Sequence, residues 1–165
     1  MHLFNIVRHY CCYSVKMLAI SLVLLVIVPQ LSLSGEVHDF ARGKIELTPP
    51  ESAPISFNVE VAGTPEERKY GLMYRTGLKP RTGMLFVYTT DAVRYFWMKN
   101  TPLSLDILFF SKDKILVHSV LGTTPFSEDV ISSRLPARYV LELETGSAYQ
   151  YGIGVGTELK FLSNR

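Results

Sequence analysis

The feature that most constrains the fold is a succession of short apolar runs separated by turn-forming residues. The first, Ile55–Val61, alternates apolar and polar residues, as a half-buried strand does. Met84–Tyr88 is continuously apolar, which favours a strand that is covered on both faces. Further strands are expected at Val93–Met98, Leu103–Phe110, Ile115–Leu121, Arg138–Leu143 and Leu159–Leu162.

Only short helices interrupt these runs. Thr64, Pro65 and Glu67 form a capping-box pattern, which predicts a short helix that ends near Gly71. A single helical turn is expected at Gly146–Tyr151. About seven strands with one or two short helices predict a mostly β domain. The spacing favours a compact sandwich or barrel, jelly-roll-like, over alternating βαβ units.

The N-terminus predicts an export signal. Met17–Val28 carries no charge, follows Arg8 and Lys16, and precedes small residues at positions 32 and 34. We therefore expect cleavage after Ser34 and an exported protein, periplasmic or extracellular. The alternative is an uncleaved anchor, although the apolar stretch is short for one. This segment is the one membrane contact that the sequence predicts.

The remaining chain divides into a tether and a domain. Residues 35–54 end in a proline-rich stretch and are expected to form an extended tether, with a short edge strand at Lys44–Leu47. The β domain is expected over residues 55–165. Removing Arg8 and Lys16 leaves equal numbers of basic and acidic residues, so a nucleic-acid partner is not predicted. Both cysteines leave with the signal, which excludes a disulfide from the exported chain.

Several sequence blocks occur in a distinctive order. They are Glu67–Arg75, Gly83–Tyr88, Phe96–Thr101, Leu105–Ile107 and Tyr139–Leu143. Together they resemble the DUF192 (UPF0127) family of uncharacterised proteins over about Phe57–Phe161, and the Trp-Met-Lys-Asn-Thr segment is the most specific part. The resemblance implies a compact, mostly β domain with jelly-roll-like or barrel-like packing, and export in many members. It implies no particular biochemical activity.

The first candidate ligand-binding residues follow a predicted strand. They are Trp97, Met98, Lys99, Asn100 and Thr101. An indole can stack on a sugar ring while the neighbouring ammonium and amide groups form hydrogen bonds, and loops at strand ends commonly present such groups. The alternative is structural: the indole is core, the thioether fills space, and the polar residues form a tight turn.

Asp106 and Arg75 complete the candidate set. Asp106 shares a strand face with apolar residues, so a buried carboxylate there needs a partner. It either accepts backbone N–H bonds in the Asn100–Thr101 turn or acts as an acid or base. Arg75 either binds an anion or forms an internal ion pair with Glu66, Glu67 or Asp106.

The sequence contains no recognisable nucleophile, cofactor loop or metal-ligand set, so no cofactor and no metal are predicted. We therefore favour a non-catalytic binding or accessory domain of the cell envelope that takes a small molecule or a saccharide. One alternative is an enzyme acting on envelope saccharide or peptide, with Asp106 as acid or base. Another is a structural or protein–protein interaction domain. The sequence gives no signal for an oligomeric state.

Overall fold

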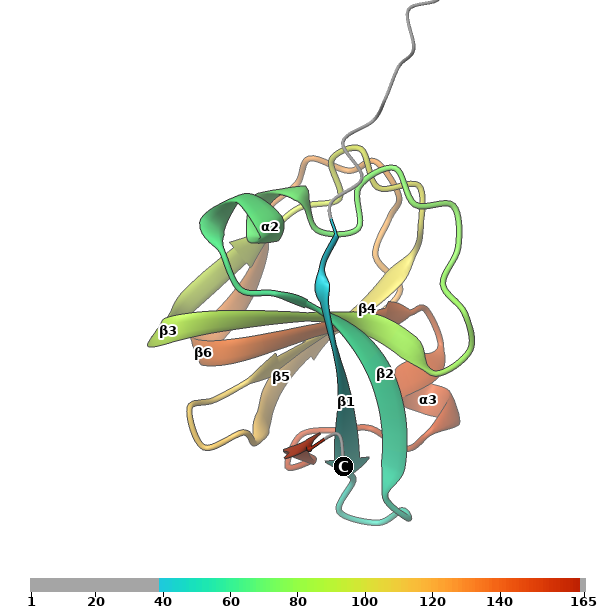
Figure 1. Ribbon diagram of the computed structural model, residues 1–165, viewed down its shortest axis with the longest axis vertical. Helices are drawn as coiled ribbons and strands as arrows, with labels where there is room; N and C mark the ends of the chain where they lie inside the picture. Colours follow the sequence, from blue (N-terminus) through green and yellow to red (C-terminus); the bar gives the residue numbers. More distant parts are fainter. Residues whose placement is uncertain (1–38, 164–165) are drawn as a thin grey trace, which may run out of the picture. The chain divides into compact units, whose positions relative to one another are not determined.

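The computed structural model describes residues 39–163. The predicted signal peptide and the first residues of the expected tether lie outside the described residues. Within residues 39–163, no helix is long and apolar enough to span a membrane. The described chain forms one strongly curled sheet with two short helices (Figure 1).

The sheet has seven strands in the order β5-β4-β6-β3-β2-β1-β7. The β2–β3 pair is parallel, and every other neighbouring pair is antiparallel. The strands are β1 (Ala41–Thr48), β2 (Ile55–Ala62), β3 (Thr82–Phe96), β4 (Leu105–Phe110), β5 (Leu116–Val120), β6 (Ile131–Glu144) and β7 (Glu158–Leu162).

The two outer strands of this sheet meet, so the sheet approaches a closed barrel. Ile115, just before β5, pairs with Glu158 of β7 in an isolated bridge. The Leu116 N–H donates to the Thr157 carbonyl at 2.8 Å, and the Leu159 N–H donates to the Lys114 carbonyl at 2.9 Å. The structure confirms the prediction of a mostly β, barrel-like domain, built here from a single sheet.

The sheet is buried on both faces. One apolar cluster fills the barrel and includes Phe57 of β2 and Phe110 of β4. A second cluster lies on the outer face and includes Met84 of β3 and Ile107 of β4. All six residues of β4 are buried, Asp106 among them.

Two strands, β3 and β6, are longer than the sequence patterns indicated. β3 is one strand of 15 residues rather than two, with a register shift between Val87 and Ala92. β6 begins at Ile131, and Ser132 pairs with Tyr95 of β3. Backbone pairing between β3 and β6 continues across polar segments whose sequences are typical of loops, so both strands extend through them.

The predicted tether also differs from the structure. β1 spans eight residues and lies between β2 and β7, so it is not an edge strand. It buries Ile45 and Leu47 inside the barrel. The folded domain therefore includes Ala41–Thr48, which the sequence analysis placed before the domain.

Both predicted helices are present. Helix α2 (Pro65–Tyr70) begins with the expected capping box: the Glu67 N–H donates to Thr64 Oγ1 at 3.2 Å, and Glu67 Oε2 accepts from the Thr64 N–H at 2.8 Å. The Arg68 guanidinium donates to the Val87 carbonyl at 3.0 Å, which ties the helix to β3. Helix α3 (Ser147–Gln150) follows β6 as a single turn.

Candidate functional site

The predicted Trp97–Thr101 segment forms the turn that follows β3. Trp97 is 44% exposed, whereas Met98 is buried in the outer-face cluster. The Lys99 ammonium lies 5.0 Å from the centroid of the Trp97 ring and 3.6 Å from Glu128 Oε1. The indole is therefore partly exposed at the surface, with the Lys99 ammonium over its ring.

Asn100 and Thr101 hold neighbouring loops together. Asn100 has a φ of 54°, and its side-chain amide donates to the Tyr74 hydroxyl at 2.9 Å. The Tyr74 N–H donates to the Asn100 carbonyl at 2.8 Å, and the Phe126 N–H donates to the Thr101 carbonyl at 3.1 Å. These contacts fit the structural alternative of a tight turn, extended to fix two further loops.

Asp106 is 1% exposed and uses both carboxylate oxygens as hydrogen-bond acceptors. Oδ1 accepts from the Gly122 N–H at 3.1 Å, and Oδ2 accepts from the Ala148 N–H at 3.0 Å. It thereby fixes the loop after β5 and the start of α3 to β4. This geometry favours the backbone-fixing role, although the turn that it fixes is not the Asn100–Thr101 turn.

Arg75 forms an internal ion pair. Its Nη2 atom lies 2.6 Å from Glu60 Oε2 on β2. The sequence analysis anticipated such a pair but not this partner, because Glu60 is brought close only by the way the chain returns after α2. Arg75 also lines a large pocket, which none of the other predicted site residues does.

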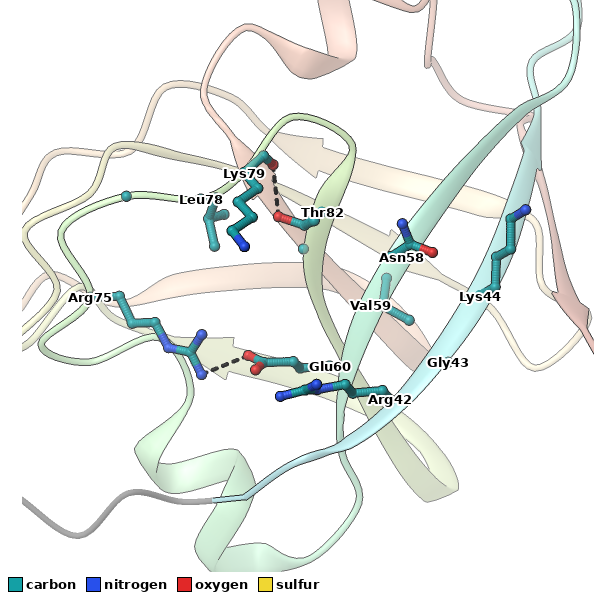
Figure 2. Close-up of a pocket in the computed structure, with 12 residues that line it drawn as sticks. Arg42, Gly43, Lys44, Asn58, Val59, Glu60, Arg75, Leu78, Lys79 and Thr82 are labelled. Carbon is teal, nitrogen blue, oxygen red and sulfur yellow. Dashed lines mark hydrogen bonds and ion pairs between the residues drawn. The ribbon is translucent and has the colours of Figure 1, made fainter. Parts of the chain in front are cut away.

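This pocket lies beside β1, β2 and residues 75–83 and has a volume of about 560 Å³. Figure 2 shows Arg75 reaching Glu60 from the loop side, with Arg42 and Lys44 coming from β1 on the other side. The lining residues are Arg42, Gly43, Lys44, Asn58, Val59, Glu60, Arg75, Gly77, Leu78, Lys79, Thr82 and Gly83.

The lining of this pocket is strongly basic. It holds four cationic side chains, Arg42, Lys44, Arg75 and Lys79, and one carboxylate, Glu60. Of these four cations, only Arg75 has a carboxylate of the described residues within 4 Å, that of Glu60. The remaining cations leave the pocket suited to an anion.

Two hydrogen bonds fix the wall of the pocket. The Asn58 N–H of β2 donates to the Arg81 carbonyl at 3.0 Å. The Thr82 hydroxyl donates to the Lys79 carbonyl at 2.7 Å. The loop is therefore anchored to the strand beside it, which preorganises the cations that it carries.

Sequence reasoning missed this pocket because its residues come from separate segments. Arg42 and Lys44 lie in the stretch expected to be a tether, and Lys79 lies in a turn. The available signal was alternation: Arg42, Lys44 and Glu46 alternate with Gly43, Ile45 and Leu47, so that one face of the strand is charged.

A second, smaller hollow brings together three of the predicted residues. Trp97, Met98 and Thr101 line a space of about 40 Å³, whereas Lys99, Asn100 and Asp106 do not. Glu142 of β6 also lines this hollow and is 5% exposed. Burial raises the pKa of its carboxyl group from 4.5 to about 8.

Sequence reasoning did not single out Glu142 as a site residue. The available signal was a charged residue within the apolar Tyr139–Leu143 run. Within residues 39–163, no group of three or more His, Cys, Asp or Glu side chains could hold a metal ion.

Comparison with known proteins identifies relatives of the same fold. The DUF192 family model, described as "Uncharacterized ACR", matches residues 47–161. A crystal structure of a proposed transcription regulator from Sinorhizobium meliloti 1021 shares 36% identity, with a TM-score of 0.72, over 74% of this chain and 95% of that one. A protein of unknown function from Novosphingobium aromaticivorans DSM 12444 shares 30% identity, with a TM-score of 0.72, over 76% of this chain and 89% of that one.

No similar protein was found among curated sequences. The family match covers more than half of the chain, and it includes every sequence block on which the resemblance rested. The solved relatives share the fold along most of their own length. On this basis the chain belongs to the DUF192 family.

Proposed function

We propose that this protein is an exported, non-catalytic binding domain that takes an anionic small molecule in the pocket between β1, β2 and residues 75–83. The observation that carries the proposal is that four cationic side chains and only one carboxylate line this pocket. The whole chain has a formal net charge of only +2. A concave surface with one sign of charge attracts ligands of the opposite sign.

The size and chemistry of the pocket support a small-molecule ligand. Its volume of about 560 Å³ lies within the range of ligand sites. Glu60 holds the Arg75 guanidinium in place, and a guanidinium can bind a carboxylate or phosphate group through two parallel hydrogen bonds. The best candidates are therefore carboxylated or phosphorylated sugars and molecules of similar size.

The side chains that line the pocket favour binding over catalysis. The pocket lining contains neither histidine nor cysteine. Its one hydroxyl group, on Thr82, donates to a backbone carbonyl. Asp106, the candidate acid or base, already accepts two backbone hydrogen bonds. A transcriptional role is not carried over from the Sinorhizobium relative, because the net charge gives no global attraction for DNA.

The binding test uses the chain from Gly35 onwards and isothermal titration with glucuronate, inorganic phosphate and, as the uncharged comparison, glucose. We expect the anions to bind, glucose not to bind, and added salt to weaken binding. The double variant Arg42→Gln/Lys44→Gln should weaken anion binding at least about tenfold, since two attractive charges are lost.

A matched control carries the same loss of charge outside the pocket. Lys112→Gln/Arg134→Gln removes two exposed cations that do not line it. Equal weakening in both double variants, or no anion binding at millimolar concentration, would contradict the proposed site.

Export is tested separately by the mass of the protein recovered from the host cell. A periplasmic or secreted form that begins at Gly35 is the expected result. A full-length form in the membrane fraction would indicate an anchor, and a full-length cytoplasmic form would refute export.

A further inference from the structure

Glu142 is a buried carboxyl group that the basic pocket does not use. It lies on β6 between Met84 of β3 and Ile107 of β4 in the pairing register. Both neighbours belong to the outer-face cluster, so its side chain points to the same face. Among the described residues, Glu142 has no side-chain hydrogen bond or ion pair.

The hollow that Glu142 lines is surrounded by electron-rich side chains. Besides the carboxyl group, it is lined by aromatic rings and thioethers, namely Tyr70, Phe86, Phe96, Trp97, Met73 and Met98. The faces of aromatic rings are electrostatically negative and attract cations. Such a lining favours a positively charged occupant over an anion.

The cations nearby do not neutralise Glu142. Arg68 lines the hollow, but its guanidinium donates to the Gly63 and Val87 carbonyls and lies 4.7 Å from the centroid of the Tyr88 ring. Lys69 lines the same hollow and is exposed. Tyr88 of β3 does not line the hollow. Its pKa is raised chiefly by burial and further by the negative charge of Glu142.

We propose that the hollow above Glu142 binds the primary ammonium group of a small amine, with the Glu142 carboxylate as its counter-ion. A buried carboxylate is stabilised by a paired cation, and the surrounding rings add cation–π attraction. The volume of about 40 Å³ admits an ammonium group with a short alkyl stem, since one water needs about 10–15 Å³. This site is separate from the basic pocket, so either proposal can fail alone.

Binding of an ammonium ion at this site releases the carboxyl proton of Glu142. The free carboxyl group is mostly protonated at neutral pH, because burial raises the pKa of Glu142 to about 8. When the alkylammonium ion enters, the carboxyl proton leaves to solvent and a carboxylate–ammonium pair forms. Affinity should therefore rise about tenfold per pH unit below pH 8 and level off above it.

The experiment titrates the chain from Gly35 onwards with n-propylamine at pH 6, 7 and 8, and with 1-propanol as the neutral analogue of the same shape. Trp97 is the only tryptophan of the chain and lines the hollow, so its fluorescence reports occupation. We expect saturable binding of the amine that tightens with pH, release of about one proton at pH 7, and no binding of propanol.

Two variants complete the test. Glu142→Gln should reduce amine affinity at least about tenfold and abolish its pH dependence. The control Glu144→Gln, at the exposed end of the same strand, should bind as the wild type does. The Arg42→Gln/Lys44→Gln variant should also bind the amine normally, which separates this site from the anion pocket.

Three results would overturn the proposal of an amine site. Propanol binding that weakens as pH rises would show that the protonated carboxyl group receives a neutral ligand, and it would overturn the proposal. So would an absence of saturable amine binding, or unchanged binding in Glu142→Gln. If that variant does not fold, the sign of the pH dependence in the wild-type protein decides.

Discussion

The burial of Glu142 predicts a strong and specific dependence of stability on pH. The folded protein holds the carboxyl proton more tightly than the unfolded chain does, because the pKa rises from 4.5 to about 8. Glu142 therefore imposes no penalty below pH 4.5. As pH rises from 4.5 to 8, folding increasingly requires either a buried charge or a retained proton, and stability falls.

The size of this effect follows from the two pKa values. At about 1.4 kcal/mol per pH unit, the change from 4.5 to about 8 costs the folded state about 5 kcal/mol above pH 8. By the same relation, about 3 kcal/mol of that cost is already present at pH 7. Glu142→Gln removes the titration, so it should increase stability relative to wild type by these amounts.

The assay is urea denaturation of wild type and Glu142→Gln at pH 5, 6, 7 and 8, in the absence of amines. The difference in unfolding free energy should grow by about 1.4 kcal/mol per pH unit across this range. Tyr88 stays protonated in this window, because burial raises its pKa above 10, so it does not contribute to the difference. A constant difference at all four pH values would refute the reasoning, and Glu144→Gln provides the control for loss of an exposed carboxylate.

Two further predictions concern groups that hold the fold together. Asp106→Asn replaces an acceptor of two backbone N–H groups, one in a buried and one in a part-buried hydrogen bond, with a side chain that has one acceptor. It should destabilise the protein by about 1–3 kcal/mol in urea denaturation; a loss below about 0.5 kcal/mol would argue against the backbone-fixing role. Gly83→Ala places a Cβ atom near the Glu142 carbonyl and Leu143 Cδ2, so it should lower stability by about 1–3 kcal/mol, measured as a lower thermal midpoint. An unchanged midpoint would mean that β3 and β6 separate at little cost.

The local features of the fold could be predicted from the sequence. The capping box at Thr64 is a pattern within four residues. The continuous apolar run at Met84–Tyr88 includes three consecutive buried residues of β3, Met84, Leu85 and Phe86. Pairing partners could not be read in this way. The placement of β1 between β2 and β7 depends on contacts between distant segments, and so does the ion pair of Arg75.

The candidate sites show the same division. The sequence drew attention to Trp97 and Met98, which do line one hollow. It drew attention to Asp106 and not to Glu142, although both are single carboxylates within apolar runs of the sequence. Their surroundings differ: two backbone amides face the first, and an unpaired hollow faces the second. Only the packing of loops over the sheet determines which carboxylate is satisfied.

The parallel pairing of β2 with β3 has a consequence for how this scaffold can diversify. Two parallel neighbours cannot be joined by a tight turn, so the chain must make an excursion of a dozen or more residues between them. Here that excursion contributes α2 and Met73 to the smaller hollow and residues from Arg75 to Lys79 to the larger one. Changes confined to this one connection could thus alter the ligand preferences of both places at once, while the strand ladder beneath them stays the same.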